Sequence, residues 1–225
     1  DPWKKYKSLD EGSDYTIQAI KRLCQLSKTC LFEVGTEEAI RSFTPTELQI
    51  FLDNLKDGLT APEFNRIAYC VVQSGVGLDL VNQKNTGTFD EDRLLEMLRI
   101  CKNFNVLSKE HNADYLTSNE LKRRFDLGLD AANIAPEIGQ IETKIYLETL
   151  DESTLENVYH LCLDSKKWEK WVDKDFDSED REKLIQVCGH YIFSHSDFPQ
   201  PSEILKKEIV SKIQNKIARL LNTDG

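Results

Sequence analysis

A run of chemically different polar side chains follows the apolar pair Val106 and Leu107. It supplies a cation, a carboxylate, an imidazole, an amide, a second carboxylate and a phenol: Lys109, Glu110, His111, Asn112, Asp114 and Tyr115. Thr117 and Glu120 then form the T-x-x-E pattern of a helix capping box. A strand that turns polar at its carboxyl end and leads into a helix is where α/β proteins place their chemistry. Residues 106–116 therefore mark the centre of a candidate site.

The imidazole of His111 suits either a metal ligand or a proton carrier. The alternative is a structural histidine that is satisfied by a backbone carbonyl, and the spacing does not separate the two. Lys109 is a catalytic candidate because its cation can neutralise a phosphate or an oxyanion, although a salt bridge to a nearby carboxylate explains it equally well. Asp114 is a second catalytic candidate, and Asn112 is a candidate for binding substrate hydroxyls or phosphate.

Other polar residues lie in or after two earlier apolar runs. Glu33 interrupts the run 30–34, where a buried carboxylate is costly unless it is paired or bound to a metal. Glu37, in the following loop, is a catalytic candidate at a site mouth, although an exposed loop acid is the usual explanation. Gln73 ends the run 67–73, where it either binds a substrate hydroxyl or satisfies a loop as a buried amide.

A helix is expected to begin just after a fourth short apolar run, at residues 131–135. Free backbone N–H groups at a helix start suit an anion, and (β/α)8 barrels often hold a phosphate at their late strands. Asn133, Glu137 and Gly139 are therefore candidates for substrate binding. The signal is weak by itself because every helix has such an end.

These residues need strands and helices to position them, and the chain shows four strand–loop–helix units. A helix with Ser13 or Asp14 as its N-cap precedes them, and further helix starts are expected at Thr44 and Asp90. Strands that are buried on both faces predict parallel pairing and the α/β class. Four units ending at Leu150 are half of a (β/α)8 barrel, which takes about 250 residues.

The sequence pattern changes after residue 150. Only helical patterns follow, with expected caps at 178–180 and at Ser202. The predicted organisation is therefore a half barrel at 1–150 and a helical C-terminal extension at 151–225. Residues 82–87 are expected to form an exposed loop.

Composition excludes several classes of function. The 225 residues carry a net charge of -10, whereas a nucleic-acid surface needs clustered Lys and Arg. The sequence contains neither an apolar run of about 20 residues nor a signal peptide, so we expect no membrane partner. Six scattered cysteines predict free thiols in a reducing cytoplasm.

P-loop, G-x-G-x-x-G, G-x-S-x-G and H-E-x-x-H motifs are absent from the sequence. Because the sequence begins with Asp1 and its only methionine is Met97, we expect a fragment or a cleaved product.

In order and spacing, several segments resemble the accessory (non-catalytic) subunit family of D-tagatose-1,6-bisphosphate aldolase, a relative of the class II metal-dependent aldolases. The resemblance covers residues 13–221 and rests on these pieces: 34–37, 71–76, 110–115, 167–171 and 191–196. It implies the second half of a TIM barrel. It also implies a metal-dependent sugar-phosphate aldolase or epimerase with a phosphorylated sugar as substrate.

The resemblance also implies a ligand set. His111 and Glu33 would hold a divalent metal, zinc in the aldolases, with Glu37 as the alternative acid. A catalytic aldolase subunit would be the partner in an oligomer. Gln73 and Gly75 depart from the pattern, because an aldolase offers a histidine there. A non-catalytic stabilising subunit and a carbohydrate-binding scaffold therefore remain as alternative functions.

Overall fold

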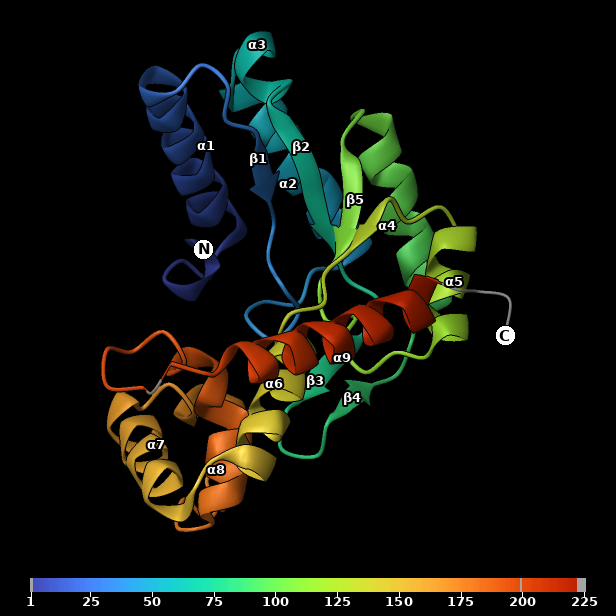
Figure 1. Ribbon diagram of the computed structural model, residues 1–225. Helices are drawn as coiled ribbons and strands as arrows, with labels where there is room; N and C mark the ends of the chain where they lie inside the picture. Colours follow the sequence, from blue (N-terminus) through green and yellow to red (C-terminus); the bar gives the residue numbers. More distant parts are fainter. Residues whose placement is uncertain (1, 199, 222–225) are drawn as a thin grey trace. The chain divides into compact units, whose positions relative to one another are not determined.

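The computed structural model describes residues 2–198 and 200–221. The protein is α/β, mostly helical, and contains a parallel sheet (Figure 1). Its described residues form two compact units. The first contains residues up to 77, 86–113 and 123–133, and the second contains 78–85, 114–122 and the residues from 134 onward.

The parallel sheet belongs to the first unit. Its strands are β1 (Phe32–Val34), β2 (Ile67–Val72), β5 (Leu107–Glu110) and β6 (Ala131–Ala132), in the order β1-β2-β5-β6. All neighbouring pairs are parallel, as the sequence predicted. The order runs in one direction and lacks the reversal of a doubly wound sheet. Four strands do not by themselves close a barrel, so the barrel stays a prediction.

One face of this sheet is covered by helices. The elements around it are η1 (Pro2–Lys4), α1 (Leu9–Leu26), α2 (Pro45–Gly58), α3 (Ala61–Phe64) and α4 (Glu91–Asn103). In Figure 1, α2 and α4 lie behind the strands. Alternate strand residues such as Val34, Cys70 and Val72 pack against apolar helix residues such as Leu55 and Met97. The buried core therefore lies between the sheet and these helices.

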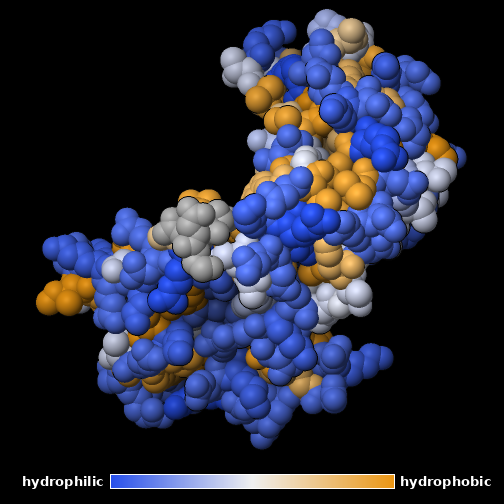
Figure 2. Space-filling model, turned by 90° about the vertical axis from the view of Figure 1, so that its right-hand side faces the viewer, coloured by the Kyte–Doolittle hydropathy of each residue, from blue (hydrophilic) through white to orange (hydrophobic). Residues whose placement is uncertain are grey.

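The opposite face carries the other alternate residues. The register sets Glu33 beside Tyr69 on β2, and Val71 beside Lys109 on β5. By the same alternation Leu31 and Leu107 belong to this face, and they are 68% and 47% exposed. Figure 2 shows hydrophobic surface interrupting the hydrophilic surface on the unit that holds the sheet.

The first helix starts earlier than predicted. α1 begins at Leu9, and Ser8 is its N-cap, with a side chain that accepts a hydrogen bond from the Glu11 N–H. The expected caps were wrong because Ser13 is buried and donates to the Leu9 carbonyl at 2.7 Å. Ser8 takes the cap because its hydroxyl also donates to the Glu11 carboxylate, a reciprocal pairing that Ser13 does not make.

The other expected helix starts of this unit are confirmed. Thr44 and Glu47 form a capping box at α2, and Asp90 caps α4. The segment 82–87 is largely exposed, as expected, but the expected loop is wrong at 84–87, because β3 (Val76–Asp79) and β4 (Lys84–Gly87) pair as a two-stranded sheet. Asp79 closes their turn by accepting two hydrogen bonds from Asn82.

The second unit is helical. It contains α6 (Pro136–Thr149), α7 (Glu152–Ser165), η2 (Glu169–Trp171), α8 (Arg181–Cys188), η3 (Gly189–Tyr191) and α9 (Glu203–Leu221). α5 (Ser118–Asp126) has residues in both units. α6 packs with α8, η3 and α9, although we expected it to close the last strand–helix unit. The predicted domain boundary at residue 150 stays a prediction. None of the helices in the described ranges is long and apolar enough to cross a membrane.

Candidate functional site

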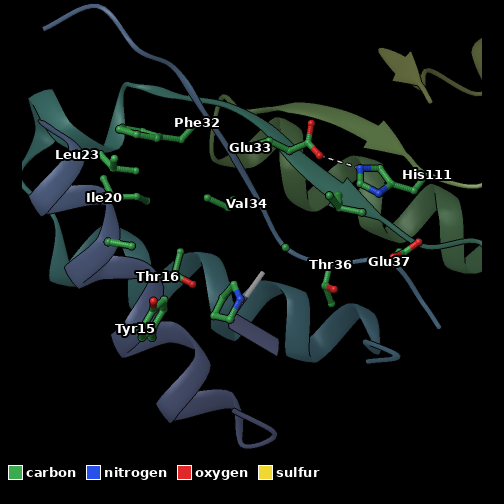
Figure 3. A pocket seen from close by; sticks show the side chains of 14 residues that line it. Tyr15, Thr16, Ile20, Leu23, Phe32, Glu33, Val34, Thr36, Glu37 and His111 are labelled. Carbon is green, nitrogen blue, oxygen red and sulfur yellow. Dashed lines mark hydrogen bonds and ion pairs between the residues drawn. The ribbon is translucent and has the colours of Figure 1, made fainter. Parts of the chain in front are cut away.

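Three of the predicted residues meet at the carboxyl ends of β1 and β5. The Glu33 Oε1 atom lies 2.7 Å from His111 Nε2 (Figure 3), and Glu33 Oε2 forms an ion pair with Lys109 Nζ. Glu33 is on β1, whereas Lys109 is on β5 and His111 follows it, so parallel pairing through β2 brings them together. All three side chains are partly exposed.

The cluster holds a charged carboxylate. Burial acts to raise the pKa of Glu33, but hydrogen bonds from Lys109 and His111 outweigh it and hold that pKa below its ordinary 4.5. Lys109 Nζ also lies 4.5 Å from the centre of the Tyr69 ring, a cation–π distance. The salt bridge that the sequence left as an alternative for Lys109 therefore exists, and its partner is Glu33.

A pocket of about 420 Å³ opens beside this cluster. Glu33, Glu37 and His111 form its polar end. The remaining lining is largely apolar and comes from α1, β1 and β2: Tyr15, Thr16, Ala19, Ile20, Leu23, Phe32, Val34 and Val71 (Figure 3). Thus a small set of polar groups faces a mostly apolar cavity, which is the usual composition of a small-molecule site.

Glu33 and His111 also fit part of a metal shell. Carboxylate oxygen and imidazole nitrogen are both zinc ligands, and catalytic zinc usually takes three protein ligands. Within the described ranges, no group of three His, Cys, Asp or Glu side chains is placed to hold a metal. This chain thus supplies a pair of ligand-type groups, and metal binding stays a prediction.

Gln73 lies in the same unit but is fully engaged by protein groups. Its amide nitrogen donates to the carbonyls of Thr36 and Arg41, each at 2.9 Å. Its amide oxygen accepts from the Phe43 N–H at 2.7 Å and from the Arg93 guanidinium at 3.0 Å. The side chain is 3% exposed. These contacts match the alternative of a buried amide that holds a loop.

Asn112 and Asn133 also lie in the first unit, close to β5 and β6 in the chain. Asn112 is buried, adopts a left-handed backbone (φ 65°) and donates from Nδ2 to the Val76 carbonyl at 3.2 Å. Asn133 is exposed, and its backbone N–H donates to the Glu110 carbonyl at 2.9 Å. Asn112 therefore fixes the chain next to His111.

The helix start expected to bind phosphate is occupied by the protein itself. In the second unit, Asp114 Oδ1 accepts the N–H groups of Ala135 and Glu137 at 2.9 and 2.8 Å. Burial raises the pKa of Asp114, and these N–H groups act against that rise. Glu137 accepts the Tyr115 N–H and pairs with Lys216 at 2.5 Å.

Gly139 has a packing role in the same helix. A Cβ atom on Gly139 would lie 2.6 Å from the Cβ of His190, closer than such contacts normally allow. The close approach of α6 to η3 therefore depends on this glycine. Substrate binding by Gly139 stays a prediction.

One buried constellation was missed from the sequence. Glu110 and Arg124 form an ion pair at 2.8 Å with side chains only 5% and 2% exposed, and the Ser74 hydroxyl also donates to Glu110. Burial raises the pKa of Glu110, and Arg124 partly offsets that rise. Strand alternation was the available signal, because it places Glu110 on the opposite face from Lys109.

Comparisons with known proteins bear on the fold. No protein-family model matches the chain, and no curated protein does. A probable tagatose 6 phosphate kinase from Sinorhizobium meliloti 1021 has a similar structure, with a TM-score of 0.53 and 15% identity. That match covers 84% of this chain and 56% of the other.

A second similar structure is the fructuronate-tagaturonate epimerase UxaE from Cohnella laeviribosi, with glycerol bound. Its TM-score is 0.55 at 11% identity, and the match covers 94% of this chain and 47% of that one. The chain therefore spans about half the length of both proteins. At these identities the likeness shows a shared fold.

Proposed function

We propose that this chain belongs to an enzyme of carbohydrate metabolism that moves a proton on a carbon beside a sugar carbonyl, as an epimerase or aldolase of sugar phosphates does. The observation that carries the proposal is the cluster of Glu33, Lys109 and His111 at adjacent strand ends. The two similar structures are named for tagatose 6 phosphate and for fructuronate and tagaturonate, which supports a sugar derivative as substrate.

The cluster has the parts that such chemistry needs. The Glu33 carboxylate is charged and in contact with an imidazole, so the pair can take a proton and return it. The Lys109 cation, which pairs with Glu33, would stabilise the oxyanion that forms when a carbon beside a carbonyl loses its proton. Epimerisation and aldol cleavage share this enediolate. If Glu33 and His111 held a divalent metal instead of carrying the proton, the metal would polarise the carbonyl.

The same proposal includes the fold. A one-directional strand order, with helices on one face, is the arrangement of strands in a (β/α)8 barrel. The other face then points to the barrel interior, which explains why it carries Glu33 and Lys109 next to exposed Leu31 and Leu107. The matches cover only 56% and 47% of the two similar structures, which supports a barrel that residues outside this chain complete.

The test is proton exchange in the intact protein. We expect the intact protein to catalyse the incorporation of deuterium from D2O into tagatose 6-phosphate, fructose 6-phosphate or tagaturonate. NMR measures the incorporation. Glu33→Gln and His111→Ala should each lower the exchange rate by about 100-fold or more. Glu182→Gln, at an exposed position of α8, is the matched control and should leave the rate unchanged. Unchanged exchange in both site variants would contradict the proposal.

A second candidate function is a non-catalytic subunit that stabilises a separate aldolase. The observation that favours it is that the described residues offer a ligand pair rather than a set of three. A protein that holds no metal and turns over no ketose phosphate until an aldolase polypeptide is added would establish this role instead.

A further inference from the structure

Three lysines surround a tyrosine in the second unit. Lys166, Lys167 and Lys170 line a hollow of about 630 Å³ together with Glu169 and Tyr191. This set of five residues is called the lysine pocket below. It lies where η2 meets η3, well away in the chain from Glu33 and His111.

Aromatic rings contact Tyr191 and the lysines of the lysine pocket. The indole N–H of Trp171 donates to the Tyr191 hydroxyl at 3.0 Å, which ties η2 to η3. The His190 ring packs against the Tyr191 ring at 3.9 Å between centres. Lys170 Nζ lies 4.7 Å from the Trp171 ring centre and 5.0 Å from that of Tyr191. Lys167 Nζ lies 5.6 Å from the Tyr191 ring centre.

The charge of the lysine pocket differs from that of the chain. The whole sequence has a net charge of -10, yet three cations and one carboxylate line this hollow. Within residues 2–198 and 200–221, none of the three lysines forms an ion pair with a carboxylate. Lys166 has a left-handed backbone (φ 53°), with which α7 ends and the chain turns into the lysine-bearing segment. These cations, two of them held over aromatic rings, leave room for an anion.

We propose that the lysine pocket binds a phosphate-bearing ligand. Lysine binds phosphate as a point charge, and a dianionic phosphate matches the excess of two positive charges that line the hollow. A phosphorylated sugar and free inorganic phosphate share this chemistry. The sugar would add ring contacts with the partly exposed Tyr191 face. This binding does not depend on the proposed enzymatic role of Glu33.

Calorimetric titration at low salt tests the pocket with three probes: inorganic phosphate, glucose 6-phosphate and unphosphorylated glucose. We expect heat from both phosphates and none from glucose. Tighter binding of glucose 6-phosphate than of phosphate identifies the sugar ester as the ligand, and equal binding identifies phosphate alone. Binding of glucose as strong as that of its phosphate, or no binding of either phosphate, overturns the proposal.

Matched variants separate a site from general charge. Replacing Lys166, Lys167 and Lys170 with Gln should weaken phosphate binding at least tenfold. Replacing Lys144, Lys207 and Lys212 with Gln removes the same charge from exposed positions on α6 and α9 and should have little effect. A variant with Arg at the three pocket positions should bind phosphate, which shows that the loss in the Gln variant is not caused by unfolding. Equal weakening in both Gln variants overturns the proposal.

Discussion

At the scale of single residues, Glu33 is held in its charged form by groups from one other strand. Lys109 and His111 both reach Glu33 because a single strand, β2, lies between β1 and β5. Each of their hydrogen bonds favours the charged carboxylate over the neutral acid. These hydrogen bonds are made only in the folded protein, so folding lowers the pKa of Glu33. A group of this kind makes stability depend on pH.

We expect Glu33→Gln to flatten the acid side of the stability profile. The folded pKa of Glu33 lies below the ordinary 4.5, so its contribution is present above that value and is lost as the pH falls through the folded pKa. Urea midpoints measured by circular dichroism between about pH 6 and 3 should fall less steeply in the variant than in the wild type. Identical slopes would show that the contacts of Glu33 are not made in solution.

Gln73 gives a second prediction at this scale. Gln73→Leu leaves the Phe43 N–H and the Thr36 and Arg41 carbonyls without this buried partner, so the free energy of unfolding should drop by about 1–3 kcal/mol. Denaturant unfolding measures the loss. A variant with wild-type stability but impaired substrate binding would reverse the assignment and favour the substrate role.

The family resemblance, rather than the spacing of residues, grouped His111 with Glu33 or Glu37. Glu33 and His111 meet at 2.7 Å because the carboxyl ends of parallel strands lie at one edge of the sheet. The partners of Gln73 and Asp114 could not be predicted, since they are backbone groups whose positions depend on loops far along the chain.

At the scale of elements, the start of α6 shows a helix capped from a distance. Ala135, at the N-cap position, offers no side-chain acceptor, and Asp114 fills the place from 21 residues earlier. The carboxylate satisfies two N–H groups and faces the positive end of the helix dipole. An external anion would have to displace it.

Asp114→Ala should therefore destabilise the second unit by about 1–2 kcal/mol, the usual cost of a lost cap. Asp114→Asn keeps an acceptor oxygen and should lose less. Hydrogen exchange of the α6 amides measures the effect locally, and faster exchange in the alanine variant is expected. If Asp114→Ala leaves α6 protection intact while abolishing substrate turnover, the residue is catalytic as the sequence suggested.

Helix boundaries were predictable where the signal was local. Thr44 with Glu47, and Asp90, carry their cap in four consecutive residues, and each was found. α1 was misplaced because Ser13 was expected as its cap, whereas Ser8 pairs with Glu11 at the helix start and Ser13 is buried inside the helix. The pairing of β3 with β4 escaped detection since polar Lys84–Gly87 has no alternating pattern to reveal it.

At the scale of the whole molecule, the sheet has one covered face and one that exposes leucines. Parallel sheets normally bury both faces. A chain with Leu31 and Leu107 exposed on such a face should associate with another polypeptide or with itself.

We expect Leu31→Ser combined with Leu107→Ser to reduce self-association of residues 1–225. Sedimentation velocity measures the change, and a shift toward monomer is the expected outcome. Leu26→Ser with Leu221→Ser changes two leucines of similar exposure outside the sheet face and should leave association unchanged. A wild-type chain that is already a sharply melting monomer would contradict the half-barrel proposal.

The division into two units has a consequence for biosynthesis. The chain passes from one unit to the other at 77/78, 85/86, 113/114, 122/123 and 133/134. Neither unit can be excised as a single stretch, and the first has no complete sheet until β6 has left the ribosome. Segments 78–85 and 114–122 belong to the second unit, so they can pack only after the later helices of that unit have been synthesised. A cut at residue 150 would thus keep the whole first unit but leave the second without α7, α8 and α9, and nascent chains of that length should recruit chaperones.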